Sequence, residues 1–327
     1  MKILITGSAG HLGEAMMRTL KTDPKDAVGL DIKPSPHTTH VGTIADRDFV
    51  ARSMDGIDVV IHAATLHKPH VATHTHQDFL DVNMTGTLNL LEEAVANKVK
   101  AFIFTSTTST FGRALVPPPG EPAAWITETV VPVPKNIYGV TKVAAENLCE
   151  LFHRKHGLPC LILRTSRFFP EEDDSPAVRQ AYSGDNAKVN EFLYRRVDVE
   201  DIVTAHLLAI ERAPAIGFDR FIISATTPFE PSDLVALRQD LPAVVARHFP
   251  NYVAEYERQG WQMFPKLDRV YVNAHARELL GWRPAYDFGH LLEQLVAGSG
   301  WGSALARKIG SKGYHSEIFG DGPYPVD

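Results

Sequence analysis

Residues 6–13 read Thr-Gly-Ser-Ala-Gly-His-Leu-Gly and lie between an apolar run at residues 2–5 and a helix-like stretch. Glycine tolerates positive φ and has no Cβ, so backbone N–H groups and the positive end of a helix dipole can face a pyrophosphate there. The spacing is G-x-x-G-x-x-G rather than the dehydrogenase pattern G-x-G-x-x-G. Its place between a strand and a helix predicts a dinucleotide-binding turn at Gly7, Gly10 and Gly13.

An acidic residue ends the second predicted strand. Asp31 follows the glycine turn by roughly 20 residues, the separation at which a carboxylate meets the adenosine ribose. That carboxylate can accept hydrogen bonds from both ribose hydroxyls, and it repels a 2′-phosphate. NAD is therefore predicted rather than NADP, although Lys33 could soften the repulsion. A plain loop carboxylate is the structural alternative.

Short β-branched runs alternate with amphipathic stretches along the first half, which is typical of βαβ units around a parallel sheet. Helices are predicted at 79–97, 138–156 and 199–212, a loop at 170–176, and an irregular aromatic-rich stretch from 224 to Trp261. Strands are predicted at 2–6, 27–31, 38–41, 58–63, 100–106, 160–164 and 221–223.

The predicted fold class is α/β, a Rossmann-type doubly wound parallel sheet with a smaller C-terminal α/β substrate lobe. Residues 1–165 are assigned to the NAD-binding domain, to which 197–224 return. Residues 166–196 and 225–327 are assigned to the substrate lobe.

Composition narrows the functional class. The 327 residues carry a net charge of −6 without a basic stripe, so no nucleic-acid partner is expected. No apolar run approaches the ~18 residues of a membrane span, and the first strand begins too early for a signal peptide. Cys149 and Cys160 form neither a disulfide framework nor a C-x-x-C zinc site, and both are expected to be buried. These features predict a cytoplasmic enzyme.

The chemistry is predicted in the segment Tyr138-Gly139-Val140-Thr141-Lys142. Side chains at i and i+4 share one face of a helix. Tyrosine has an ordinary pKa of about 10, so it becomes a base at neutral pH only beside positive charge. Lys142 and an oxidised nicotinamide would supply that charge, and Tyr138 could then take a proton from a substrate hydroxyl as hydride leaves the same carbon.

Several sequence motifs, taken in their order along the chain, resemble the extended short-chain dehydrogenase/reductase superfamily, specifically the NAD-dependent epimerase/dehydratase family. The resemblance covers nearly the whole chain. Beside the glycine turn and the Tyr138/Lys142 pair, the matching blocks are Asp58–Ala64, Asn83–Leu91 (N-x-x-G-T-x-N-L-L), Phe102–Gly112 and Leu279–Pro284, which is similar to L-G-W-x-P.

The resemblance implies Thr107, Tyr138 and Lys142 as the catalytic set. Thr107 would hold the reacting oxygen, with Ser106 one place before it, and Lys142 would also bind the nicotinamide ribose. A homodimer through the helices at 79–97 and 138–156 is expected. The candidate cofactor-binding residues are Gly7, Ala9, Gly10, His11, Leu12, Gly13, Asp31, Ile32, Ala63, Ala64, Asn83, Thr105, Tyr138 and Lys142.

Departures from the family narrow the reaction. Thr108 and Ser109 stand where sugar-nucleotide 4,6-dehydratases carry Asp-Glu, which argues against dehydration. Arg167 stands where sugar-nucleotide epimerases usually have an asparagine. The prediction is an oxidoreductase acting on a secondary alcohol of a sugar-like or polyhydroxylated small molecule, with epimerisation as the alternative. A non-catalytic NAD sensor or scaffold is a third hypothesis, against which the intact catalytic set argues.

Four histidines lie between His67 and His76 in the loop that, in this family, overhangs the active site. They could bind a transition metal or an anion, or simply be polar lid residues. No metal is expected, because the family's chemistry needs none. Anion binding, with Lys68, Arg167, Arg195 and Arg196 as helpers, would fit an anionic substrate. The candidate substrate residues are His67, Thr107, Arg167 and Arg196.

Two acidic features are given structural roles. Asp201 is expected to cap a helix or anchor the lobe rather than to act in catalysis. The acidic run 171–174, beside Arg179, is expected to form a solvated lid.

Overall fold

A computed structural model describes residues 1–21, 26–313 and 319. Its main sheet has seven strands in the order β3-β2-β1-β4-β5-β7-β8, all of them parallel. This doubly wound order confirms the predicted fold class. The strands are β1 (Lys2–Thr6), β2 (Asp26–Asp31), β3 (His40–Val41), β4 (Val59–His62), β5 (Ala101–Thr107), β7 (Cys160–Thr165) and β8 (Phe218–Ile223).

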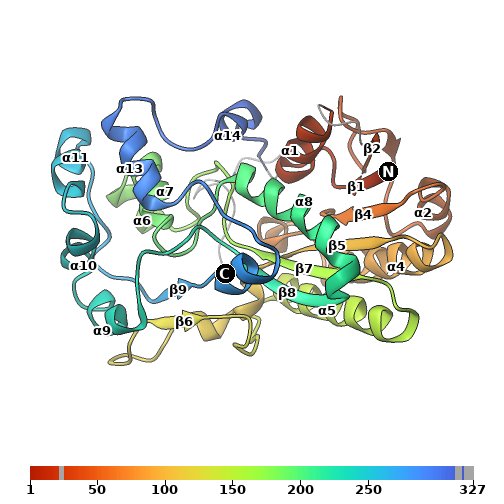
Figure 1. The fold of residues 1–327 in the computed structure, drawn as a ribbon, viewed down its shortest axis with the longest axis horizontal. Helices are drawn as coiled ribbons and strands as arrows, with labels where there is room; N and C mark the ends of the chain where they lie inside the picture. The colour runs from red at the N-terminus through yellow and green to blue at the C-terminus, as the bar shows by residue number, and fades with distance from the viewer. Residues whose placement is uncertain (22–25, 314–318, 320–327) are drawn as a thin grey trace.

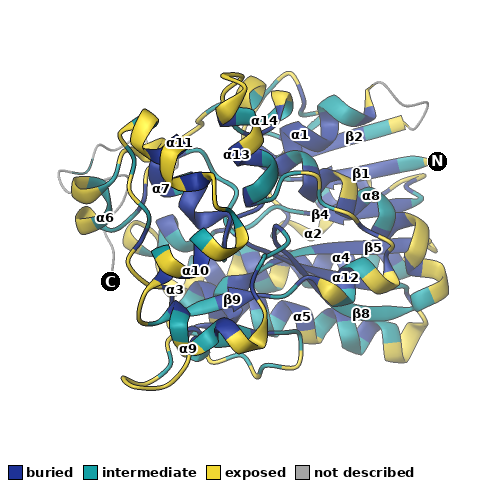
Figure 2. Ribbon diagram, turned by 60° about the vertical axis from the view of Figure 1, so that its left-hand side comes forward, coloured by how far each residue is buried: buried dark blue, intermediate teal, exposed yellow. Residues whose placement is uncertain are grey.

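Helices cover both faces of this sheet (Figure 1). One face carries α1 (His11–Leu20), α8 (Val199–Ile216) and α14 (Ala304–Ile309), and the other carries α2 (Arg47–Ser53), α4 (Gly86–Ala96) and α5 (Ile137–His156). Side chains alternate along a strand, so Ile3 and Ile5 enter the first core while Leu4 enters the second. Figure 2 shows the strands buried beneath exposed outer helix faces.

The helix predicted at 79–97 begins three residues earlier and is not uniform. It comprises α3 (His76–Phe79), the π-helical segment η2 (Leu80–Thr85) and α4. Thr75 and Asp78 form a reciprocal cap, because the Asp78 N–H donates to Thr75 Oγ1 at 3.2 Å and the Thr75 N–H donates to Asp78 Oδ2 at 2.7 Å. This capping box sets the start of the helix.

The second lobe is mostly helical around a small parallel pair of strands, β6 (Ala124–Ile126) and β9 (Arg269–Tyr271). The short 3₁₀ segments η1 (Lys68–Ala72), η3 (Thr108–Phe111), η4 (Arg113–Leu115) and η5 (Pro231–Asp233) connect larger elements. The remaining helices are α6 (Pro176–Ala181), α7 (Gly184–Glu191), α9 (Leu234–Leu237), α10 (Leu241–His248), α11 (Tyr252–Gln259), α12 (Ala274–Leu279) and α13 (Phe288–Val296).

The prediction of an irregular stretch up to Trp261 was wrong, because α9, α10 and α11 lie within it. Asp240 caps α10 by accepting a hydrogen bond from the Ala243 N–H at 3.1 Å. Tyr252 and Tyr256 belong to the same buried cluster as Phe288 of α13. The spacing of the aromatic residues alone does not predict these helices, because their buried faces pack against helices from other parts of the chain.

The proposed domain boundaries stay a prediction, although β8 joins the main sheet from the returning segment. β6 belongs to the predicted NAD-binding range but pairs with β9 of the lobe. Residues 314–318 and 320–327 of the predicted lobe lie outside the described residues. Within the part that the structure describes, no helix is long and apolar enough to span a membrane.

Asp201 anchors the lobe, as one of its two predicted roles requires. Its carboxylate accepts hydrogen bonds from the backbone N–H groups of Ala285 at 2.8 Å and Tyr286 at 2.9 Å. The cap of α8 is Asp198, which accepts from the Glu200 N–H at 2.8 Å. Cys149 and Cys160 are both buried, as expected.

Replacing Asp201 by Asn should destabilise the protein. Asn offers one acceptor oxygen where the carboxylate offers two, so one backbone N–H at Ala285 or Tyr286 loses its partner. The loss of one hydrogen bond at this partly exposed site costs about 0.5–1.5 kcal/mol, which should lower the Tm in a thermal unfolding scan. Glu200→Gln removes the same charge on the same helical turn and serves as the control. Equal Tm values for the two variants would refute the anchoring role.

Candidate active site

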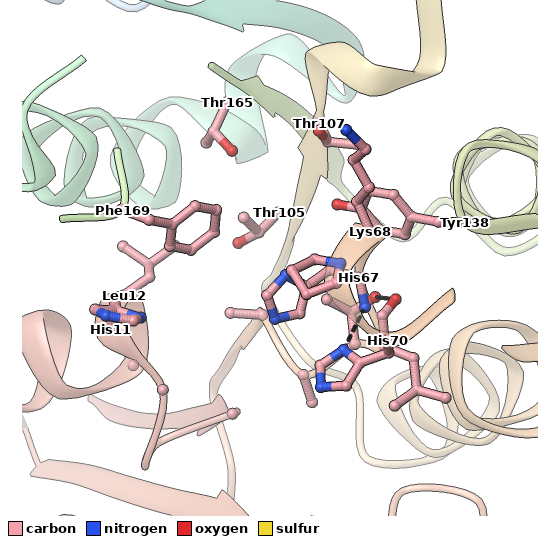
Figure 3. Close-up of a pocket in the computed structure, with 18 of the residues that line it drawn as sticks. His11, Leu12, His67, Lys68, His70, Thr105, Thr107, Tyr138, Thr165 and Phe169 are labelled. Atoms are coloured by element: carbon pink, nitrogen blue, oxygen red, sulfur yellow. Dashed lines mark hydrogen bonds between the residues drawn. The ribbon is translucent and has the colours of Figure 1, made fainter. Parts of the chain in front are cut away.

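A cavity of about 730 Å³ runs along the carboxyl ends of the main strands, between the sheet and the lobe. Residues from the glycine turn line it at one side and residues of α5 at the other. Figure 3 shows His11 and Leu12 across this space from Tyr138 and Thr107, with His67 between them. In open α/β sheets this edge is the usual place for a ligand.

The glycine turn packs too closely for side chains at two of its three glycines. Gly7 has a φ of +77°, and a Cβ there would lie 2.9 Å from the Ala64 nitrogen. A Cβ on Gly13 would lie 2.0 Å from the Gly7 carbonyl oxygen. Gly10 precedes α1 without a side chain to cap it and borders the cavity. This bare helix start fits a bound pyrophosphate.

Asp31 is fixed beside this turn. Its carboxylate accepts hydrogen bonds from the backbone N–H of Ala9 at 2.9 Å and of Lys33 at 2.8 Å, and it lines the cavity. The Asp31 carboxylate therefore lies next to the start of α1. This is the position expected for a side chain that binds an adenosine ribose. The residues present fit a nicotinamide dinucleotide with its adenosine half at Asp31.

Tyr138 and Lys142 lie on the buried face of α5. Asn136 caps the start of this helix, because its side-chain oxygen accepts a hydrogen bond from the Gly139 N–H at 3.1 Å. Lys142 Nζ donates to the Thr105 carbonyl oxygen at 2.6 Å and lies 4.0 Å from the centre of the Phe104 ring. Thr107, at the end of β5, lines the same cavity as Tyr138, and its hydroxyl acts to lower the pKa of that tyrosine. The structure thus brings the predicted catalytic set together.

Burial controls the protonation of this pair. Burial raises the pKa of Tyr138 to about 12, although the Thr107 hydroxyl acts in the opposite direction. Burial lowers the pKa of Lys142 to about 7, and the nearby Glu146 carboxylate opposes that change. Tyr138 is therefore neutral, and Lys142 loses its proton easily. The tyrosine needs further positive charge nearby before it can act as a base.

Glu146, one helical turn beyond Lys142, was not singled out from the sequence. Its buried carboxylate accepts from Ser106 Oγ at 2.5 Å and from Arg164 Nη2 at 2.7 Å, which ties α5 to β5 and β7. The spacing of Tyr138, Lys142 and Glu146 by four residues could have identified this third position on the same helical face.

The acidic loop after β7 is buried in ion pairs, so the prediction of a solvated lid was wrong. Asp173 accepts from Arg167 at 3.2 Å and from Arg195 at 2.7 Å, and Lys68 pairs with Asp174. Burial acts to raise the pKa of Asp174, but the Lys68 ammonium outweighs it and holds that pKa at about 2. Three cations of the predicted anion site are thus already neutralised by the protein.

Two candidate residues do not border the cavity. Arg196 is buried beneath it, where Nε donates to Glu191 at 2.7 Å and Nη1 donates to the Phe169 carbonyl oxygen at 2.8 Å. Asn83 is buried behind the wall and donates to the Leu66 carbonyl oxygen at 2.9 Å. All other predicted cofactor, catalytic and substrate residues line the cavity.

The histidine segment divides in two. His67 and His70 line the cavity, whereas His74 and His76 are exposed outside it. The His67 ring stacks on Phe169 with centres 5.6 Å apart, and its backbone N–H donates to His70 Nδ1 at 3.0 Å. Among the described residues, no group of three or more His, Cys, Asp or Glu side chains could hold a metal ion.

A sequence model described as the NAD-dependent epimerase/dehydratase family matches residues 3–219. A UDP-glucose 4-epimerase from Streptococcus mutans is 26% identical, over 92% of this chain and 96% of its own length. An uncharacterized UDP-glucose epimerase from Bacillus subtilis is 28% identical, but the chain spans only 55% of that relative. A short-chain dehydrogenase/reductase superfamily protein from Agrobacterium tumefaciens, solved with bound NAD, has a TM-score of 0.65 at 22% identity, over 94% of this chain and 97% of its own.

Replacing Lys142 by Met should raise the Tm, and more so at pH 6 than at pH 9. The ordinary pKa of lysine is about 10.4, and burial lowers that of Lys142 to about 7. The unfolded chain therefore binds more protons between these values, and the fold loses stability as pH falls through this window. Lys155→Met, on the exposed face of α5, is the control. A Tm difference that does not vary with pH would contradict the burial of an ammonium.

Replacing Asp31 by Asn should reduce the preference for NAD over NADP by about tenfold or more, since charged hydrogen bonds contribute about 1.5–3 kcal/mol. The amide neither repels a 2′-phosphate nor accepts from both ribose hydroxyls. Fluorescence titration with each dinucleotide measures the ratio. Asp26→Asn, at the exposed start of the same strand, is the matched control. An unchanged ratio would remove Asp31 from the cofactor site.

Proposed function

Because the chain belongs to the NAD-dependent epimerase/dehydratase family, we propose that it transfers hydride between NAD and a secondary alcohol of a sugar-like or polyhydroxylated small molecule. The family match confirms the predicted family and supports the prediction of an NAD-dependent enzyme. The likeness to a short-chain dehydrogenase/reductase structure shows the same fold. The observation that carries the proposal is the convergence of Thr107, Tyr138 and Lys142 on the cavity that the glycine turn and Asp31 also line.

The roles follow from the geometry. Bound NAD supplies a hydride acceptor and, when oxidised, a positive charge beside the catalytic set. Thr107 and Tyr138 hold the substrate hydroxyl between them, and Tyr138 Oη takes its proton as hydride leaves the carbon. Lys142 stabilises the tyrosinate through its charge, and its hydrogen bond to the Thr105 carbonyl oxygen fixes where that charge lies.

Epimerisation is the second candidate function, supported by the UDP-glucose epimerases among the relatives. It uses the same residues, but the ketone is reduced again on its other face and no reduced cofactor is released. We favour net dehydrogenation because Arg167 stands where sugar-nucleotide epimerases usually have asparagine, and its guanidinium is held by Asp173.

We further propose a homodimer formed through α4 and α5 and the segment that precedes α4. Apolar side chains at Leu80 and Val140 are 37% and 50% exposed, respectively, on these helices. Such residues are suited to a helical interface, and sedimentation velocity would test the association state.

Tyr138→Phe should lower turnover by about a hundredfold or more, the scale of general acid–base catalysis, while NAD affinity stays within a few-fold. Steady-state kinetics and dinucleotide titration measure the two quantities. Tyr252→Phe, on a lobe helix remote from the cavity, is the control. Full turnover in Tyr138→Phe would overturn the catalytic assignment.

Two measurements on the purified protein distinguish dehydrogenation from epimerisation. Absorbance of the reduced nicotinamide is recorded before and after denaturation, and NAD reduction is then screened with sugars, sugar acids and sugar nucleotides. Release of NADH with one substrate class establishes a dehydrogenase. A tightly retained dinucleotide with no net NADH, together with interconversion of epimers, would favour epimerisation instead.

A further inference from the structure

Arg269 is a cation at the cavity wall without an acidic partner. It begins β9 in the lobe, and its guanidinium carbon lies 5.5 Å from the centre of the Tyr194 ring and 5.7 Å from that of Tyr271. Within residues 1–21, 26–313 and 319 it makes neither an ion pair nor a hydrogen bond through its side chain, and its Nε is buried without a partner. Two aromatic rings thus hold a charge in place that no carboxylate neutralises.

The other two arginines at this wall also have a buried Nε without a hydrogen bond, but carboxylates neutralise them. Arg167 and Arg195 both pair with Asp173, and Arg195 also pairs with Glu191 at 2.6 Å. Arg269 is half-buried, so its guanidinium keeps only part of its hydration, and an anion at the cavity edge would supply the partner that the described residues do not. Arg269 is therefore the stronger candidate for contact with an anionic ligand.

Arg269 belongs to the substrate side of the cavity rather than to the dinucleotide turn. Tyr271, its neighbour on the same strand face, packs against Phe111 with ring centres 6.4 Å apart. Phe111 ends η3, the short helix that directly follows Thr107. An anionic group at Arg269 would thus be part of a ligand whose alcohol reaches Thr107 and Tyr138.

The same cavity restricts the size of that ligand. A bound dinucleotide would occupy the stretch from Asp31 to Tyr138. Beyond the acidic loop, the lobe contributes Arg195, Arg269, Tyr271, Lys312 and Gly313 to the lining. No described residue of 176–194 or 221–268 borders the space. A nucleotide sugar carries a second nucleotide, and the described residues of this wall line no further space for it.

We propose that Arg269 binds the anionic group of a compact sugar, either a carboxylate or a phosphate, and that nucleotide sugars are not the substrates. A planar guanidinium can donate two parallel hydrogen bonds to either group. The inference rests on the proposed function, since it names the substrate class of that same site.

Binding to the protein loaded with NAD tests the inference without requiring turnover. Intrinsic tryptophan fluorescence or calorimetry is followed during titration with galacturonate against galactose, glucose 6-phosphate against glucose, and UDP-galactose. We expect one compact anion to bind at least tenfold more tightly than its neutral counterpart and more tightly than UDP-galactose. The galacturonate and glucose 6-phosphate arms distinguish a carboxylate from a phosphate.

Arg269→Gln should weaken binding of the preferred anion by about tenfold to a hundredfold, the scale of a charged hydrogen-bonded pair, and leave the neutral sugar unchanged. Arg269→Lys keeps the charge and should retain part of the preference. Arg52→Gln, exposed on α2, is the control for loss of one positive charge.

The inference is overturned by equal affinity for anionic and neutral sugars, by tighter binding of UDP-galactose, by no binding of any probe, or by an anion preference that survives in Arg269→Gln. None of these outcomes contradicts the proposed hydride transfer. That proposal is contradicted by a different result, full turnover in Tyr138→Phe. Circular dichroism of Arg269→Gln and Arg269→Lys verifies that both fold.

Discussion

The buried carboxylate of Glu146 joins three elements around the proposed catalytic residues. It lies on α5 one turn beyond Lys142 and accepts hydrogen bonds from Ser106 of β5 and Arg164 of β7. A buried charge is stable only when its hydrogen-bonding capacity is filled, so this carboxylate fixes the helix against the ends of both strands. Thr107, one residue after Ser106, is thereby held opposite Tyr138.

The two sides of the cavity differ in the groups that provide their electrostatics. At the dinucleotide turn, Gly7 and Gly13 allow a backbone contact that any side chain would prevent, and Asp31 is held there by backbone N–H groups. On the proposed substrate side, Asp173 neutralises two arginines, and Arg269 has no ion pair among the described residues. Backbone groups thus dominate the proposed dinucleotide side of the cavity, and side-chain charges dominate its proposed substrate side.

Glu171 connects these sides. It pairs with His11 of the glycine turn at 3.0 Å and accepts a hydrogen bond from the Lys312 backbone N–H at 3.0 Å. Burial acts to raise the pKa of Glu171, but its contact with the His11 ring and the hydrogen bonds from backbone N–H groups outweigh burial and hold that pKa at about 2. The loop that carries Glu171 also carries Asp173, so one short segment contacts both the cofactor side and the substrate side.

The sequence by itself determined the Rossmann-type sheet, the glycine turn with Asp31, and the pairing of Tyr138 with Lys142, because each depends on residues close together in the chain or on a repeated strand–helix period. Only the tertiary structure decided that Asp173 neutralises Arg167, that Arg196 lies beneath the cavity wall, and that α10 and α11 are helices. Ion pairing and packing join residues far apart in the chain, and neither hydrophobic periodicity nor motif spacing records which distant partner a side chain will meet.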